Sequence, residues 1–268
     1  MDISVRQVVG LVPAAGSGKR IAPLPCSKEL FPIGVKPTKD KSEARAKVVS
    51  HYLLEKFRIA GITTAYIVLR EGKWDIPAYF GDGAMLDMHL AYLAISDSCG
   101  PPDTLDRAYP FVQNKFIAFG FPDILVTPDD VYIQLLERQM STNADLVLGL
   151  YPARDPRLMD MIRVDTEGRV TELVLKPPQT DLRYGWICAV WAPTFTQFLH
   201  HFVLSDEARQ YQREGGRQID PQGDLPVGAV IQAAIRKGVR VDGVTFPEGT
   251  YLDIGTPDDL VKAMQLYR

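Results

Sequence analysis

A glycine-rich turn followed by two cations is the first feature of this sequence that could carry chemistry. Gly16 and Gly18 lie just before Arg20, and Lys28 follows within the run Pro-Cys-Ser-Lys-Glu-Leu-Phe-Pro. Glycine lets the backbone approach an anion closely, and successive N–H groups in such a turn can point at one phosphate group. Arginine adds a bidentate contact and lysine a point charge. This spacing predicts a loop that binds phosphate groups.

The segment before the turn must position it. Residues 8–15 are almost entirely apolar, which is typical of a central strand in a parallel sheet covered on both faces. Two familiar phosphate-binding loops do not fit the turn. A P-loop needs Gly-x-x-x-x-Gly-Lys-Ser/Thr, and a dinucleotide fold needs a third glycine where Ile21 stands. The pattern that remains is Gly-x-Gly-x-Arg followed by Pro-x-x-Lys-Glu-Leu-x-Pro.

Residues 12–34, VPAAGSGKRIAPLPCSKELFPIG, resemble the signature of the sugar-1-phosphate nucleotidylyltransferases, the family of the glucose-1-phosphate thymidylyl- and uridylyltransferases. Lys19 stands where this family usually has threonine, and Pro13 where it usually has alanine. The resemblance implies that the loop wraps the triphosphate of a nucleotide, with Arg20 and Lys28 on the departing pyrophosphate. It assigns nucleotide contacts to Ala14, Ala15, Gly16, Ser17, Gly18, Lys19, Arg20 and Lys28.

Two aspartates at predicted strand ends could hold a metal ion. Asp123 ends the run FGFPD, and Asp253 lies in YLDIGTPDDL; both runs are similar to family motifs that carry an aspartate at this place. Mg²⁺ prefers one or two carboxylates plus substrate phosphates, and the resemblance implies that both aspartates bind it. A helix-capping or turn aspartate is the alternative for each. For Asp129 and Asp130, which follow in TPDD, we favour helix capping.

The residues expected for the second substrate depart from the family pattern. Lys176, in LVLKPP, matches the lysine that the resemblance assigns to the phosphate of the sugar; a strand-end lysine facing water is the alternative. Leu175 replaces the glutamate that holds sugar hydroxyls in the family. Other acceptor-pocket positions fall on Met161, Ile187 and Cys188. A hydroxyl buried without a partner costs about 1–3 kcal/mol, so we expect an altered or differently bound acceptor.

The resemblance implies a nucleotidyl transfer in which a phosphate oxygen of the sugar phosphate attacks the α-phosphorus of a nucleoside triphosphate. Arg20, Lys28 and Lys176 would be its catalytic residues and Mg²⁺ its cofactor. A phosphate monoester is mostly dianionic at neutral pH, so no general base is required, and the four histidines need no catalytic role. Two other hypotheses stay open: a catalytically silent nucleotide-binding or regulatory relative, and a glycosyltransferase that uses a nucleotide sugar.

The composition fits a globular protein that binds a small polyanion. The chain has 268 residues, of which 46% are hydrophobic, and its net charge of −3 does not favour a nucleic-acid surface. Residues 1–60 nevertheless hold eleven Lys or Arg against five Asp or Glu. No apolar run is long enough for a membrane helix, residues 1–7 lack the pattern of a secretory signal, and three isolated cysteines suit a reducing cytosol. We therefore expect a cytoplasmic protein, which by resemblance forms a homo-oligomer.

Alternating strand and helix patterns predict an α/β fold in a single domain, residues 1–268. We expect a Rossmann-like, mixed but mostly parallel central sheet flanked by helices, of the nucleotide-diphospho-sugar transferase type. Predicted strands cover 8–15, 63–70, 88–96, 115–126, 144–153, 184–193 and 239–246, with a hairpin over 161–177. Predicted helices cover 42–61, 127–143, 194–203, 225–238 and 257–268. Ser42 and Thr127 would start the first two helices, and residues 204–223 would form a mobile loop.

Overall fold

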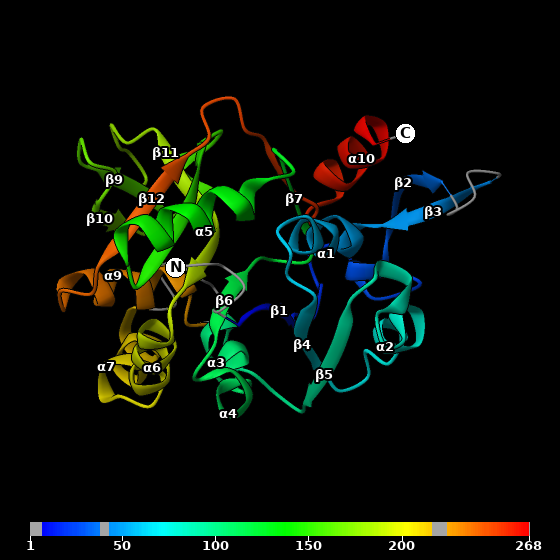
Figure 1. The fold of residues 1–268 in the computed structure, drawn as a ribbon, viewed down its shortest axis with the longest axis horizontal. Helices are drawn as coiled ribbons and strands as arrows, with labels where there is room; N and C mark the ends of the chain where they lie inside the picture. The colour runs from blue at the N-terminus through cyan, green and yellow to red at the C-terminus, as the bar shows by residue number, and fades with distance from the viewer. Residues whose placement is uncertain (1–6, 38–42, 216–223, 268) are drawn as a thin grey trace.

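A nine-stranded mixed sheet forms the centre of the computed structural model, which describes residues 7–37, 43–215 and 224–267 (Figure 1). Its parallel part consists of β1 (Val8–Ala14), β4 (Thr64–Arg70), β5 (His89–Ile95) and β6 (Phe116–Phe119). β1 lies between β4 and β6, and β5 lies beyond β4, all running in the same direction. The phosphate-loop candidate therefore leaves the sheet from a central parallel strand, as predicted.

The other part of the sheet is attached through one long antiparallel strand. The strands of this part are β8 (Leu146–Pro152), β9 (Met161–Val164), β10 (Val170–Val174), β11 (Tyr184–Trp191) and β12 (Val241–Thr245). β11 pairs with β8 along one edge, while β9 and β6 share its other edge. β9 and β10 form the predicted antiparallel hairpin, and β12 runs parallel to β8. The mixed sheet is confirmed, and the single-domain assignment stays a prediction.

Helices cover both faces of the sheet. On one face lie α1 (Val49–Ile59) and α5 (Val131–Thr142); on the other lie α3 (Pro101–Asp106), α6 (Pro193–Val203) and α9 (Val227–Arg236). Successive side chains of a strand point to opposite faces. In β1, Val12 accordingly packs in the core of the α1 face and Leu11 in the core of the α6 face, each only 2% exposed.

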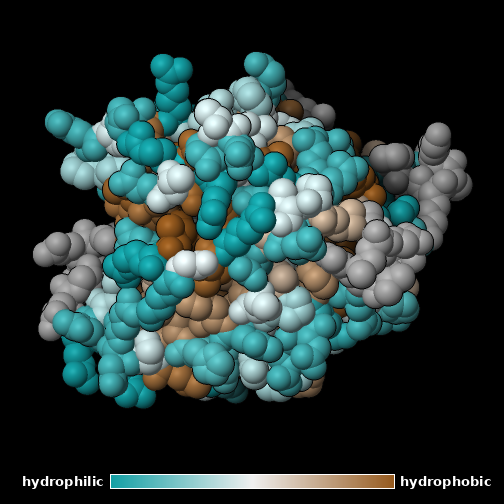
Figure 2. Space-filling model, turned by 60° about the vertical axis from the view of Figure 1, so that its left-hand side comes forward, coloured by the Kyte–Doolittle hydropathy of each residue, from teal (hydrophilic) through white to brown (hydrophobic). Residues whose placement is uncertain are grey.

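Short helices lie in the connections, and α10 (Pro257–Leu266) follows the last strand. The short helices are α2 (Asp75–Phe80), α4 (Tyr109–Val112), α7 (Asp206–Gln210), the 3₁₀ turns η2 (Lys28–Leu30), η3 (Ala84–Leu86) and η4 (Pro156–Leu158), and the π turn η5 (Tyr211–Gly215). Seen from the side that carries α6, α7 and α9, the surface is mostly hydrophilic, with apolar side chains gathered near the middle of the view (Figure 2). Within the described part of the chain, every helix is too short or too polar to cross a membrane.

Two small sheets bring distant loops together. β2 (Pro32–Pro37) pairs with β3 (Ala44–Val48), and β7 (Ile124–Val126) pairs with β13 (Tyr251–Asp253). In the second pair Ile124 lies opposite Asp253, and the Ile254 N–H donates to the Asp123 carbonyl at 3.1 Å. This antiparallel register places two aspartates that are 130 residues apart in the chain beside each other.

Two predicted helices begin later than expected. Residues 44–48 form β3 instead of the first turns of α1, because they pair with β2; Ser42 lies outside the described residues. α5 begins at Val131, four residues after the predicted start. Thr127 does not cap it, because its Oγ1 accepts a hydrogen bond from the Thr250 N–H at 2.9 Å and so joins the loop before α5 to the loop before β13.

Two further segments differ from the prediction. The predicted strand 115–126 is divided into β6 and β7 at Gly120 and Pro122. A Cβ at Gly120 would lie 2.4 Å from Tyr132 Oη, so the chain passes directly against α5 there. The predicted loop after α6 contains α7, whose start is capped by Ser205 Oγ, while residues 216–223 lie outside the described part of the chain.

We expect Phe57→Ala to lower the free energy of unfolding by ~3–5 kcal/mol, because the removed ring leaves a cavity in the core. Phe57 is fully buried, its ring centroid lies 4.7 Å from that of Tyr132, and it packs under Gly10 of β1. Urea unfolding measures the effect. Phe111→Ala is the matched control, because Phe111 is half exposed. Equal losses for the two variants would contradict this description of the core.

Candidate nucleotide-binding site

The loop after β1 is open toward solvent and has one cation lying across it. Ala14 and Ala15 are buried where the strand ends, whereas Gly16, Ser17, Lys19 and Arg20 are exposed. Lys28 runs back over the glycines: a Cβ at Gly16 would lie 3.9 Å from its Nζ, and a Cβ at Gly18 would lie 3.8 Å from its Cδ. Gly18 has φ +64°, a left-handed conformation that favours glycine. Of the predicted nucleotide contacts, Gly16 and Gly18 thus lie beside the Lys28 side chain, whereas Ala14 and Ala15 are buried at the end of the strand.

Lys28 is paired with the first predicted metal ligand. Its Nζ forms an ion pair with Asp123 Oδ2, and both side chains are largely buried. Asp123 follows β6, which is the neighbour of β1 in the sheet, so the carboxyl ends of two adjacent parallel strands meet at this ion pair. Ligand sites in open α/β sheets form outside the carboxyl ends of strands, and the predicted residues lie at that edge.

Arg20 approaches the second predicted metal ligand. A Cβ at Gly255 would lie 2.8 Å from both Arg20 Nη2 and Asp253 Oδ1, so only glycine leaves room for this approach. The Gly255 N–H also donates to Asp253 Oδ1 at 2.7 Å. The structure therefore brings Arg20, Lys28, Asp123 and Asp253 together in one cluster, with two positive and two negative charges.

The charges in this cluster act on each other. Burial raises the pKa of Asp253, and the negative charge of Asp123 raises it further. Burial acts on Asp123 in the same direction, but the charge and hydrogen bond of Lys28 hold the pKa of Asp123 below its usual value. Burial would lower the pKa of Lys28, yet Asp123 and Glu29 raise it. A cation between two buried carboxylates relieves their repulsion. In this structure Lys28 and Arg20 are the cations that do so.

The carboxylate pair suits a hard divalent cation. Within the described residues, no group of three or more His, Cys, Asp or Glu side chains gathers around one point. Asp123 and Asp253 supply carboxylate oxygens alone, which is the donor set of a Mg²⁺ ion that completes its shell with water and substrate phosphates. The residues present therefore fit the predicted magnesium ion without a dedicated protein cage.

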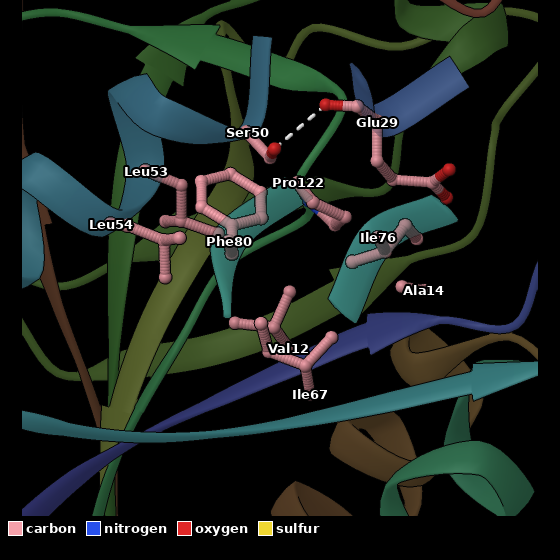
Figure 3. Close-up of a pocket in the computed structure, with 10 residues that line it drawn as sticks. All are labelled: Val12, Ala14, Glu29, Ser50, Leu53, Leu54, Ile67, Ile76, Phe80 and Pro122. Atoms are coloured by element: carbon pink, nitrogen blue, oxygen red, sulfur yellow. Dashed lines mark hydrogen bonds between the residues drawn. The ribbon is translucent and has the colours of Figure 1, made fainter. Parts of the chain in front are cut away.

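Three contacts hold the Lys28 segment in place. The backbone N–H and the hydroxyl of Ser27 donate to the two carboxylate oxygens of Asp75, at 2.6 and 2.7 Å. Ser50 Oγ donates to the Glu29 carbonyl at 2.7 Å, above an apolar cavity lined by side chains of β1, β4, α1 and α2 (Figure 3). Because these partners lie on α1 and α2, η2 is anchored to two helices of the fold independently of any ligand.

The third anchor is a buried ion pair. Lys73 Nζ donates to both carboxylate oxygens of Glu29, at 2.7 and 2.9 Å. Burial raises the pKa of Glu29, and the Lys73 charge opposes that rise. Glu29 is 2% exposed, so its negative charge is stabilised by two cations, Lys73 and Lys28, and not by water.

The predicted acceptor residues are divided between surface and core. Leu175 and Lys176 follow β10 and are partly buried, and Lys176 has φ +36°. Met161, Ile187 and Cys188 are core residues, exposed by 0%, 7% and 2%. A role of these three in binding an acceptor stays a prediction, whereas Leu175 and Lys176 have side-chain surface that a ligand could contact.

Sequence reasoning missed most of the supporting contacts. Nothing in the sequence marks Lys73 or Asp75 as partners of a loop nearly 50 residues earlier. Gly255 could have been found, because it directly follows the Asp-Ile of the Asp253 motif. Helix capping is confirmed in position for Asp130, which is the N-cap residue of α5, but its side chain makes no capping hydrogen bond and instead accepts from the Gln134 side chain at 3.1 Å. Asp129 does not cap the helix, because it pairs with Lys56 Nζ.

Comparisons with known proteins bear on the family and the fold of this chain. The family model described as nucleotidyl transferase matches residues 9–268. The low-salt glycan biosynthesis nucleotidyltransferase Agl11 of Haloferax volcanii is 25% identical over 96% of this chain, and a glucose-1-phosphate thymidylyltransferase of Streptomyces antibioticus is 25% identical over 94%. The chain spans 65% and 64% of the length of these two relatives. The crystal structure of an apo UDP-glucose pyrophosphorylase superposes with a TM-score of 0.78 at 16% identity, covering 98% of both chains, which confirms the predicted fold type.

We expect Lys73→Met to destabilise the protein by ~3–5 kcal/mol, because Glu29 is left buried without its ion-pair partner. Thermal unfolding at neutral pH measures the loss. The double variant Glu29→Met/Lys73→Met removes both charges and should recover most of the stability. If the single variant unfolds at the temperature of the parent, the buried ion pair does not support the loop as described.

Proposed function

Because the chain belongs to the nucleotidyl transferase family, we propose that it joins a nucleoside triphosphate to a sugar 1-phosphate or a similar phosphate, with release of pyrophosphate. The observation that carries the proposal is the cluster of Arg20, Lys28, Asp123 and Asp253 at the carboxyl end of β1. The thymidylyltransferase name of one relative and the pyrophosphorylase name of a structural neighbour support the same reaction.

Residues 14–19 bind the triphosphate through their backbone in this proposal. Arg20 and Lys28 take its terminal phosphates and neutralise the charge that develops on the departing pyrophosphate. Lys28 then exchanges partners: it leaves Asp123, which it neutralises in the free protein, and donates to a phosphate oxygen. The exchange frees the Asp123 carboxylate, which would then be able to hold a divalent cation together with Asp253.

Asp123 and Asp253 are the residues that would hold Mg²⁺. The ion, when bound there with the triphosphate, lowers the cost of negative charge on the phosphate oxygens. Asp123 and Asp253 lie beside Lys28 and Arg20 respectively, so a cation held by both carboxylates would lie close to these two side chains. Without the metal, the mutual repulsion of triphosphate and carboxylates opposes nucleotide binding, so activity should require a divalent cation.

Lys176 holds the phosphate of the second substrate in this proposal, so that one of its oxygens points at the α-phosphorus in line with the leaving pyrophosphate. The attacking oxygen is already deprotonated at neutral pH, because the second pKa of a phosphate monoester is about 6. The contribution of the protein is therefore positioning and charge neutralisation, with no side chain needed as a general base.

The direct test offers the purified protein a panel of nucleoside triphosphates and sugar 1-phosphates and measures pyrophosphate release, with Mg²⁺ and with EDTA. We expect Mg²⁺-dependent release for at least one pair. Triphosphate binding without release for any pair would instead support a silent nucleotide-binding relative. Binding of nucleotide sugars but of no free triphosphate would support a glycosyltransferase.

We expect Asp123→Asn to lower kcat by about 100-fold or more, because the variant loses a charged ligand that acts in the transition state. Steady-state pyrophosphate release with the best substrate pair measures the effect. Asp130→Asn is the matched control: Asp130 lies seven residues later on an exposed surface, and its variant should behave like the parent. Parent-like turnover in Asp123→Asn would remove this aspartate from the metal site.

A further inference from the structure

A second carboxylate lies beside Lys176, and the nucleotide half of the proposed reaction does not use it. Asp160 immediately precedes β9, and its Oδ2 accepts a hydrogen bond from Trp186 Nε1 at 3.3 Å. Its Oδ1 is shielded from water and accepts no hydrogen bond from the described residues. A buried carboxylate oxygen without a donor is costly, so this atom is poised to accept a hydrogen bond from a ligand.

The carboxylate of Asp160 packs against a glycine of α9 that has no side chain to displace it. A Cβ at Gly228, in the first turn of α9, would lie 2.1 Å from Asp160 Oδ2 and 2.7 Å from Leu175 Cδ2. The absence of a side chain at Gly228 therefore lets the Asp160 carboxylate and Leu175 come together. Burial raises the pKa of Asp160, while the hydrogen bond from Trp186, the charge of Lys176 and a contact with the Lys176 backbone N–H oppose the rise.

The sheet places Asp160 at the same edge as the nucleotide site. β9 pairs with β11 at Tyr184 and Gly185, and β6 pairs with the same edge of β11 from Ala189 onward. Asp160 lies opposite Trp186, and the segment that leads to Asp123 leaves β6 at the same stretch of β11. The ring of Phe121 in that segment lies 6.3 Å from the ring of Trp186. The Trp186 ring thus lies between Asp160 and the segment that leads to Asp123.

We propose that Asp160 binds a hydroxyl group of a sugar phosphate whose phosphate is held by Lys176. The proposal rests on the proposed function for the identity of the second substrate. A phosphate dianion carries no proton to donate and is repelled by a carboxylate, so the group that Oδ1 accepts from must belong to the uncharged, hydroxyl-bearing part of the ligand. Lys176 and Asp160 together then recognise a phosphate at one end of the acceptor and a hydroxyl at the other.

A structural role is the competing account, in which Asp160 only stabilises α9 and Trp186. The two accounts differ in what Asp160→Asn does. Asparagine keeps the size of the side chain and one oxygen for Trp186 Nε1, but it removes the charge and the free carboxylate oxygen. Because burial raises the pKa of Asp160, loss of this charge should leave the unfolding temperature unchanged or raise it, whereas a structural carboxylate would lower it on removal.

The test measures ligand binding by NMR titration for the parent, for Asp160→Asn, and for the exposed control Asp181→Asn. The probes are glucose 1-phosphate, galactose 1-phosphate, mannose 1-phosphate and methyl phosphate, which has no hydroxyl. We expect Asp160→Asn to raise the dissociation constant of the best-bound sugar phosphate by about tenfold or more and to leave that of methyl phosphate unchanged. The variant should show no loss of thermal stability. Asp181→Asn should match the parent for every probe.

Three results would overturn the proposal. Asp160→Asn could lose affinity equally for the sugar phosphates and for methyl phosphate, or it could keep the affinity of the parent for all probes. The third result is a parent protein that binds no sugar phosphate more tightly than methyl phosphate. None of these results depends on turnover. A parent that binds a sugar phosphate through Asp160 but releases no pyrophosphate with any triphosphate would contradict the proposed function and leave the Asp160 site standing.

Discussion

The ion pair between Lys28 and Asp123 is the interaction on which the rest of the site depends. It joins the segment after β1 to the segment after β6, which are 95 residues apart in the chain but adjacent in the sheet. The pair of β7 and β13 adds Asp253 to the same place, and Gly255 admits Arg20 beside it. Four charges from three distant segments of the chain thus meet at one edge of the sheet.

Burying two neighbouring carboxylates at this edge of the sheet lowers the stability of the free protein. Buried carboxylates repel each other, and the desolvation of buried charges is repaid only where partners are well placed. In the free protein those partners are Lys28 and Arg20 for the site, and Lys73 for the Glu29 carboxylate beneath it. In the proposed function, a ligand that brings both phosphates and a divalent cation would replace these compensating contacts with stronger ones.

The acceptor side follows a different principle. Met161, Ile187 and Cys188 are buried in the apolar core, and their role in binding an acceptor stays a prediction. In the proposed function, polar recognition falls to Lys176 and, as we infer, to Asp160. Its Oδ2 lies next to the Trp186 indole and Gly228, and its Oδ1 accepts no hydrogen bond from the described residues. A carboxylate in that position restores a hydrogen-bond acceptor beside Leu175, which has none.

The sequence predicted the parts of this structure that depend on local pattern. The apolar run of β1, the parallel neighbours, the β9–β10 hairpin and the fold type are confirmed, because strand and helix periodicity is a local property. It also singled out Arg20, Lys28, Asp123 and Asp253, which the structure brings together. It could not reveal Lys73, Asp75 or Asp160, because their partners come from distant elements with no motif. The helix predicted for residues 44–48 is wrong for the same reason: these residues pair with β2, and this distant pairing overrides their helical spacing.

The central claim is that Lys28 exchanges Asp123 for phosphate when the substrate binds. A crystal structure with a non-hydrolysable nucleoside triphosphate and Mg²⁺ tests it most directly. We predict that Lys28 Nζ donates to a phosphate oxygen, that Arg20 contacts the same triphosphate, and that Asp123 and Asp253 coordinate the metal. A structure in which Lys28 remains bonded to Asp123 and the triphosphate lies away from residues 14–20 would contradict the account.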